Sequence, residues 1–142
     1  MILKKDQKQD IVQRLDFIRI QLEDLKKFHS LTWNVYQTDR DVQRNIERLA
    51  ENVANAAIDV CKIIIAGEET LEMPNSYKEI ILKLGEIKLL EETIAQKVAQ
   101  IAQLRNILAH QYLDIKWERI KDFIANAPLV MHRFIQAAEK KI

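Results

Sequence analysis

The chain has 142 residues, of which 48% are hydrophobic and 30% are charged, and its formal net charge is +1. This length suits one ordinary domain that buries a core and stays soluble. A net charge this close to zero excludes a global positive field that would bind nucleic acid indiscriminately, so any RNA or DNA contact must come from a local patch.

Turn-forming residues are scarce, with only 2 glycines and 2 prolines. Sandwiches and α/β folds need more turns than this, so the sequence predicts an all-α fold of long helices, in one domain covering residues 1–142. The single cysteine, Cys61, allows neither an internal disulfide nor a cysteine metal cluster. With no signal-peptide pattern and no run of about 20 apolar residues, we expect a cytoplasmic protein that makes no membrane contact.

The first helix is predicted over residues 4–28, because its apolar residues recur in steps of three and four along one helical face. These residues are Ile11, Leu15, Ile18, Leu22 and Leu25. The stretch "HSLTWNVYQT" breaks the period and is expected to be a connection. Thr38, with Asp41 three residues later, resembles a helix start of the capping-box kind. A second helix should follow and run to about Ala66.

The second half of this second helix is apolar on nearly all sides. The additional apolar residues there are Ala54, Ala57, Ile58, Cys61 and Ile65. Such a helix is either central to its bundle or divided between its own core and a subunit interface. Both possibilities remain open at the level of the sequence.

Three further helices are predicted after Gly67 and a loop. Ser76 and Glu79 have capping-box spacing and should open a short helix, "YKEIILKLGEI". The next helix is expected from about residue 90 to 112. Asp114 can cap the last one, which Pro128 should kink or interrupt. The prediction is an antiparallel four-helix bundle with one short extra helix.

The segment "RNILAHQY", residues 105–112, departs from the pattern of plain helix sequence. On an ideal helix Arg105 and Tyr112 lie within about 20° of each other, and Asn106 and His110 within about 40°. Arg105 and His110 are roughly 140° apart. Their convergence on one substrate group therefore requires a distorted helix end or a second copy of the motif from a partner chain.

The chemistry of these side chains suits a phosphate. Arginine offers a fixed fork of donors for phosphate oxygens, and histidine exchanges a proton near neutral pH. RNA cleavage without a metal needs both abilities, and Asn106 could hold the histidine ring or a phosphate oxygen. However, cations near a helix C-terminus are often structural, because they meet the negative end of the helix dipole. The residues alone leave both interpretations open.

The spacing of Arg105, His110 and Tyr112, with the polar Asn106 after the arginine, resembles the signature of the HEPN superfamily. More closely, it resembles the HepT ribonuclease toxins of the HepT/MntA toxin–antitoxin systems. The likeness extends to "DRDVQRNIERLAENVANAAIDVCKIIIAG", to "PNSYKEIILKLGEI" and to the helix leading into the motif, which occur in the same order as in HepT proteins.

This resemblance implies a homodimeric endoribonuclease that needs no metal or other cofactor, with two motif helices facing each other across a cleft. Arg105 and His110 would be its catalytic residues, with Asn106 supporting them. Tyr112 would accept AMP from a cognate MntA-like nucleotidyltransferase antitoxin, and this modification would silence the toxin. Two other hypotheses compete with it. One is a non-enzymatic helical module that binds a nucleotidyltransferase or a nucleotide through Arg105, and the other is a purely structural dimer.

A few polar and aromatic residues outside the motif have open roles. Asp59 lies among apolar neighbours, where an unpaired carboxylate is costly, so it should have a cation nearby. Arg105 is one candidate and a local structural bond is the other. Trp33 and Tyr36 either stack on bases or anchor the first connection. His29 and His132 have no partner at metal-ligand spacing.

Overall fold

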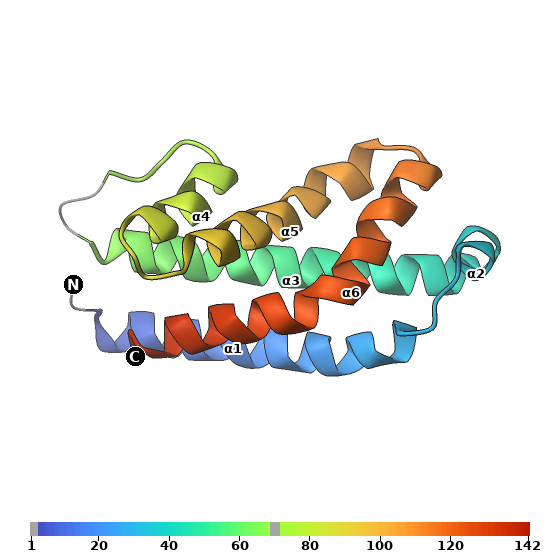
Figure 1. Cartoon of the computed structure of the whole chain (residues 1–142). Coiled ribbons are helices and arrows are strands. Elements are labelled where there is room, and N and C mark those ends of the chain that lie inside the picture. The colour runs from blue at the N-terminus through green and yellow to red at the C-terminus, as the bar shows by residue number, and fades with distance from the viewer. Residues whose placement is uncertain (1–2, 69–71) are drawn as a thin grey trace.

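The protein is all-α in a computed structural model that describes residues 3–68 and 72–142. These residues form α1 (Lys5–Leu25), a 3₁₀ turn (Lys26–Phe28), α2 (Trp33–Thr38), α3 (Arg40–Ala66), α4 (Tyr77–Glu86), α5 (Glu92–His110) and α6 (Leu113–Glu139) (Figure 1). They contain no strand. None of these helices has the length and apolar character that crossing a bilayer requires.

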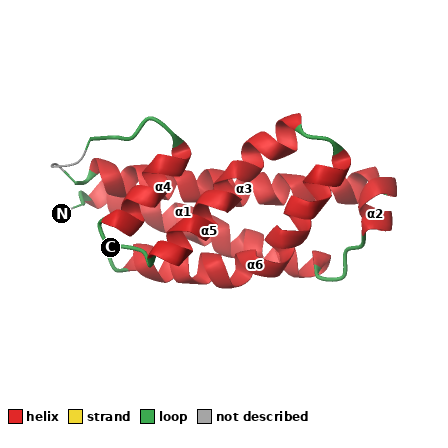
Figure 2. Ribbon diagram, turned by 45° about the horizontal axis from the view of Figure 1, so that its top comes forward, coloured by secondary structure: helices red, strands yellow, loops and turns green. Residues whose placement is uncertain are grey.

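The third helix is the centre of the bundle. It packs against α1 along its length, against α4 and α5 on another side, and against α2 and α6 (Figures 1 and 2). Its additional apolar residues are therefore all buried within one chain: Ala54, Ala57, Ile58, Cys61 and Ile65. The first of the two possibilities for this helix is confirmed, and its apolar surface gives no support to a subunit interface.

The predicted helices agree closely with the observed ones where the apolar period is strong. The second predicted helix ends at Ala66 as expected, and Gly67 follows it. Ser76 caps α4 by accepting a hydrogen bond at 3.2 Å from the backbone N–H of Glu79. The loop expected before this cap includes residues 69–71, which lie outside the described part of the chain.

The predicted connection at residues 29–38 is wrong in part, because it contains α2. Thr32 caps this helix by accepting from the N–H of Val35. Thr38 is not a cap: it is the last residue of α2, and its hydroxyl donates to the carbonyl of Asn34 at 2.6 Å. Asp39 caps α3 instead, since its carboxylate accepts from the first backbone N–H groups of that helix.

The start of the last helix also differs from the prediction. Tyr112 occupies the N-cap position of α6 without a side-chain hydrogen bond to the helix, and Asp114 lies in the first turn. In the first turn, the negative charge of Asp114 still interacts favourably with the positive N-terminal end of the helix dipole. The helix continues through Pro128 without interruption, and Figure 1 shows that it bends along its course. Proline removes one backbone hydrogen bond, and buried neighbours such as Met131 hold the rest of the helix in place.

Candidate functional site

The motif residues lie at the C-terminal end of α5 and at its junction with α6. Arg105 is half-buried, His110 is exposed in the last turn of the helix, and Tyr112 is 83% exposed. The helix α5 is continuous up to His110. Arg105 and His110 are five positions apart on it, which places them roughly 140° apart around the helix axis and about 7.5 Å apart along it. Within one chain, the structure does not bring the arginine and the histidine onto the same face.

The Arg105 side chain packs instead against Tyr77, the first residue of α4. The guanidinium carbon lies 4.8 Å from the centre of the Tyr77 ring, and the Lys62 Nζ lies 5.0 Å from the same centre. We call Lys62, Tyr77 and Arg105 the Tyr77 cluster. Its members come from α3, α4 and α5, so tertiary packing and not sequence spacing brings them together. No motif or spacing in the sequence links Lys62 or Tyr77 to the arginine.

The electrostatic environment of the Tyr77 cluster is positive. Hydrogen bonding by Arg105, followed by the charges of Arg105 and Lys62, lowers the pKa of the Tyr77 phenol, while the nearby Asp59 charge opposes this effect. Asp59 forms an ion pair with Arg14 of α1, with 3.5 Å between Oδ2 and Nε. The structural bond expected for Asp59 is thus present, and its partner is Arg14 and not Arg105. Two cations therefore lie at the Tyr77 ring, and the carboxylate that opposes them is paired with a third cation, Arg14. This excess of positive charge suits an anion.

The aromatic residues of the first connection form an anchor. Tyr36 is fully buried, so it cannot stack on bases, and its ring lies 5.2 Å from that of Trp117. Its hydroxyl donates to Glu47 at 3.2 Å, and the Lys116 ammonium approaches the other oxygen of this carboxylate at 3.4 Å. Trp33 packs against both aromatic rings. These contacts fasten α2 and the start of α6 to α3.

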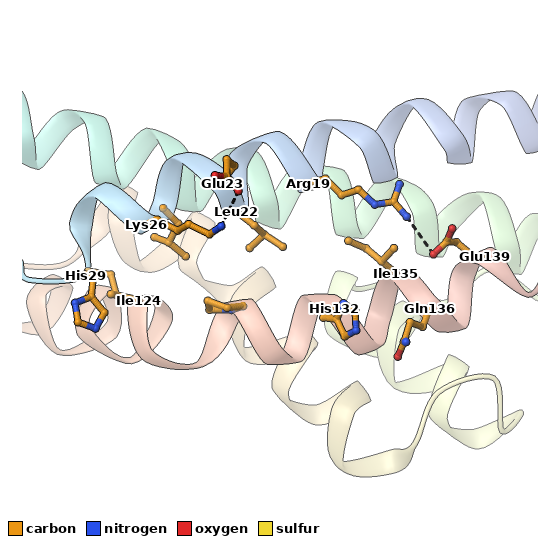
Figure 3. A pocket seen from close by; sticks show the side chains of 12 residues that line it. Arg19, Leu22, Glu23, Lys26, His29, Ile124, His132, Ile135, Gln136 and Glu139 are labelled. Carbon is orange, nitrogen blue, oxygen red and sulfur yellow. Dashed lines mark hydrogen bonds and ion pairs between the residues drawn. The ribbon is translucent and has the colours of Figure 1, made fainter.

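A groove of about 810 Å³ lies between the end of α1 and α6, and it contains no motif residue. His29 and His132 both line it, although nothing in the sequence predicted that they share a surface (Figure 3). Its rim carries an ion pair between Arg19 and Glu139 at 3.1 Å. Among the residues that the structure describes, no group of three or more His, Cys, Asp or Glu side chains could hold a metal ion.

Comparison with protein families gives a match over residues 18–138 to the family described as "Ribonuclease HepT-like". The protein "tRNA nuclease HepT" of Aphanizomenon flos-aquae (strain 2012/KM1/D3) is 34% identical over 107 residues, which cover 74% of this chain and 71% of that protein.

Two solved structures share the fold. A crystal structure of a mutant of the toxin–antitoxin MntA-HpeT aligns with a TM-score of 0.80 and 16% identity, covering 93% of this chain and 98% of that one. A crystal structure of a toxin–antitoxin with AMP-PNP aligns with a TM-score of 0.77, the same identity and the same coverage. At this level of identity, the likeness to these two structures concerns the arrangement of helices.

Proposed function

Because the chain belongs to the HepT-like family of ribonucleases, we propose that it is a metal-independent endoribonuclease toxin whose chemistry is carried out by Arg105 and His110. The family resemblance expected from the motif is confirmed, and membership in a family of enzymes favours cleavage over the binding-module hypothesis. The observation that carries the proposal is the placement of a half-buried arginine in a positive cluster, on the same helix that ends in an exposed histidine.

The proposed reaction uses the RNA's own 2′-hydroxyl as the nucleophile. His110 accepts the proton of this hydroxyl, and the 2′-oxygen forms a bond to the adjacent phosphorus. The bond from phosphorus to the 5′-oxygen breaks, and a protonated imidazole or water protonates the leaving oxygen. The products are a 2′,3′-cyclic phosphate and a 5′-hydroxyl. Arg105 stabilises the charge on the phosphorane oxygens, so this step needs no metal ion.

We further propose that the reactive site is made by two chains. One copy of α5 presents Arg105 and His110 on different sides, whereas two copies facing each other can bring the arginine of one chain near the histidine of the other. A two-fold symmetric dimer would contain two equal sites of this kind. Asn106, exposed and one residue after the arginine, is placed to contact a phosphate oxygen or the histidine ring.

An antitoxin of the MntA type is the proposed regulatory partner. Two observations support it: the likeness to solved toxin–antitoxin structures, one of them with AMP-PNP, and the exposed phenol of Tyr112 two residues after His110. The phenol oxygen would attack the α-phosphorus of ATP, release pyrophosphate and lose its proton. The added phosphate would place negative charge beside the motif, where it would repel RNA and pair with cations.

The proposal is tested with purified protein and RNA in excess EDTA. We expect the wild type to cleave, and we expect Arg105→Ala and His110→Ala each to lose roughly 10²- to 10³-fold in rate. Arg133→Ala and His132→Ala are matched controls on exposed positions of α6 and should cleave normally. Retained cleavage in His110→Ala would favour a binding module. Activity that is lost in EDTA and returns only with magnesium would exclude a metal-free mechanism.

A further inference from the structure

The Tyr77 cluster contains two cations that share one aromatic ring. Arg105 and Lys62 approach the ring centre of Tyr77 to 4.8 and 5.0 Å. The side chains of both cations are half-buried, whereas the Tyr77 side chain is 42% exposed to solvent. Over the parts of the chain that the structure describes, neither cation forms an ion pair, and Asp59, whose charge reaches Tyr77, is paired with Arg14 of α1.

Two like charges held at one ring repel each other, and partial burial strengthens that repulsion. The ring offsets part of this cost through cation–π attraction, but it supplies no counter-charge. Among the described residues, the carboxylate whose charge reaches Tyr77 is that of Asp59, and it is paired with Arg14. Among the described residues the cluster therefore carries an excess of positive charge, which an anion from solvent can balance.

We propose that Tyr77 positions Arg105 for RNA and that Lys62 is a second phosphate ligand, so that the Tyr77 cluster holds adjacent phosphates of the substrate strand. The substrate class rests on the proposed function, and the two added residues rest on the geometry. Tyr77 acts here as a positioning residue, because it contacts the arginine and not the reacting atoms.

The chemistry of a guanidinium held at an aromatic ring fits this role. Attraction to the Tyr77 ring restricts where the guanidinium lies, and its five N–H groups leave donors for a phosphate beyond the one that the Tyr77 phenol engages. The backbone of Tyr77 is held in place, because Tyr77 is the first residue of α4, which Ser76 caps. Lys62 acts as a point charge with rotatable donors, which suits a neighbouring phosphate without a fixed geometry.

Binding is tested apart from cleavage with a single-stranded RNA that is 2′-O-methylated at every position, because it lacks the attacking hydroxyl. Lys62→Ala should weaken binding roughly tenfold and reduce the salt dependence by about 0.7 of a slope unit, the value for one phosphate contact on a single strand. Lys78→Ala, an exposed lysine next to Tyr77 on α4, is the matched control and should change binding less than about twofold. An unchanged affinity and slope in Lys62→Ala would overturn the role of Lys62.

Positioning is tested with two variants of Tyr77. Tyr77→Phe keeps the ring, so its cleavage should stay within about threefold of the wild type. Tyr77→Leu removes the ring and should lower kcat at least roughly tenfold with less change in KM, because misplacement of Arg105 affects the transition state most. The exposed position of Tyr77 means that both variants should fold, which circular dichroism checks. Equal kcat values for the two variants would overturn the positioning role.

A spectroscopic signature separates a phosphate site from a purely structural contact. The ultraviolet absorbance of tyrosinate follows the Tyr77 phenol, and Tyr77→Phe identifies its transition. Arg105→Ala and Lys62→Ala should each raise the pKa of Tyr77, since they remove the groups that lower it. The methylated RNA, which is stable to alkali, should also raise this pKa in the wild type, because its phosphates offset both cations.

The outcomes distinguish this inference from the proposed function. If RNA leaves the Tyr77 transition unmoved while the wild type still cleaves RNA, the cluster is not the phosphate site and the nuclease proposal stands. If RNA moves the transition but Arg105→Ala cleaves normally, the cluster binds RNA and the proposed catalytic role of Arg105 fails.

Discussion

Two tyrosines of this protein show how the same side chain serves opposite purposes. Tyr36 is fully buried and donates its hydroxyl to Glu47, and burial, followed by the charge of that carboxylate, raises the pKa of its phenol. Tyr77 is 42% exposed and lies beside Arg105 and Lys62, whose effects lower the pKa of its phenol. One phenol is held neutral inside a network, and the other lies beside cations at the surface.

The comparison indicates that the residues that stabilise the bundle and those proposed to bind RNA form two separate groups. The network around Tyr36 satisfies its own polar groups, since Glu47 accepts from both Tyr36 and Lys116. The Tyr77 cluster leaves two cations without a carboxylate among the described residues. The complete network contributes to folding, whereas the Tyr77 cluster, by our proposal, is completed by the phosphates of a ligand.

The largest expected effect concerns Tyr112, whose phenol is the most exposed of the three in the chain. After incubation with the transferase and ATP, followed by removal of the transferase, the wild type should gain mass in AMP units and lose nuclease activity. Tyr112→Phe should do neither, because the acceptor oxygen is absent. Tyr77→Phe is the matched control and should be labelled like the wild type. Labelling of Tyr112→Phe but not of Tyr77→Phe would place the acceptor at Tyr77, since Tyr36 is buried.

A smaller effect is expected for the buried network. Glu47→Ala leaves the mostly buried Lys116 and the Tyr36 hydroxyl without their partner, which should lower the free energy of unfolding by roughly 2 kcal/mol. Thermal and denaturant unfolding measure this loss. Glu118→Ala, which removes an exposed ion pair with Lys121, should stay within about 0.5 kcal/mol. Specific cleavage activity at low temperature should remain normal in both variants, and a selective loss of cleavage in Glu47→Ala would break the separation of the two regions.

The smallest expected effects concern the free energy of unfolding at alkaline pH, which the two tyrosines should change in opposite directions. The raised folded-state pKa of Tyr36 means that the unfolded chain releases its proton first, so this residue contributes stability that declines above about pH 10. The lowered folded-state pKa of Tyr77 makes the folded chain release its proton first, so its contribution is lost as the pH falls through that pKa. The free energy of unfolding of Tyr36→Phe and of Tyr77→Phe is measured between pH 8 and about 11 and subtracted from that of the wild type. The subtraction removes the contribution of the lysines, which titrate in all three proteins. If the free-energy difference from the wild type changed with pH in the same direction for both variants, the opposite pKa shifts of the two tyrosines would be contradicted.

The sequence predicts much of this fold because its strongest signals are local. The apolar period predicts α3, the capping residue Ser76 predicts the start of α4, and the motif indicates Arg105 and His110 as candidate catalytic residues. The start of α3 was misjudged because Thr38 and Asp39 are both good caps, and only the helical conformation of Thr38 decides between them.

The Tyr77 cluster could not be predicted from the sequence in the same way. Its three residues come from three helices, and although the motif singles out Arg105, neither Lys62 nor Tyr77 belongs to any sequence pattern that links it to the arginine. Their proximity depends on how α3, α4 and α5 pack, which no spacing rule encodes. The ion pair of Arg14 with Asp59 is hidden for the same reason, since α1 must lie beside α3 before it can form.

The most direct test of the account asks whether Arg105 of one chain works with His110 of its partner. Arg105→Ala and His110→Ala, each inactive alone, are unfolded together at equal concentrations, refolded and assayed for RNA cleavage. In a symmetric dimer, about half of the molecules are mixed and each of these regains one of its two sites, so about a quarter of the wild-type activity should return. Arg105→Ala refolded with the double variant is the control and should stay inactive. A mixture of the two single variants that remains as inactive as either one alone would contradict a site shared between two chains.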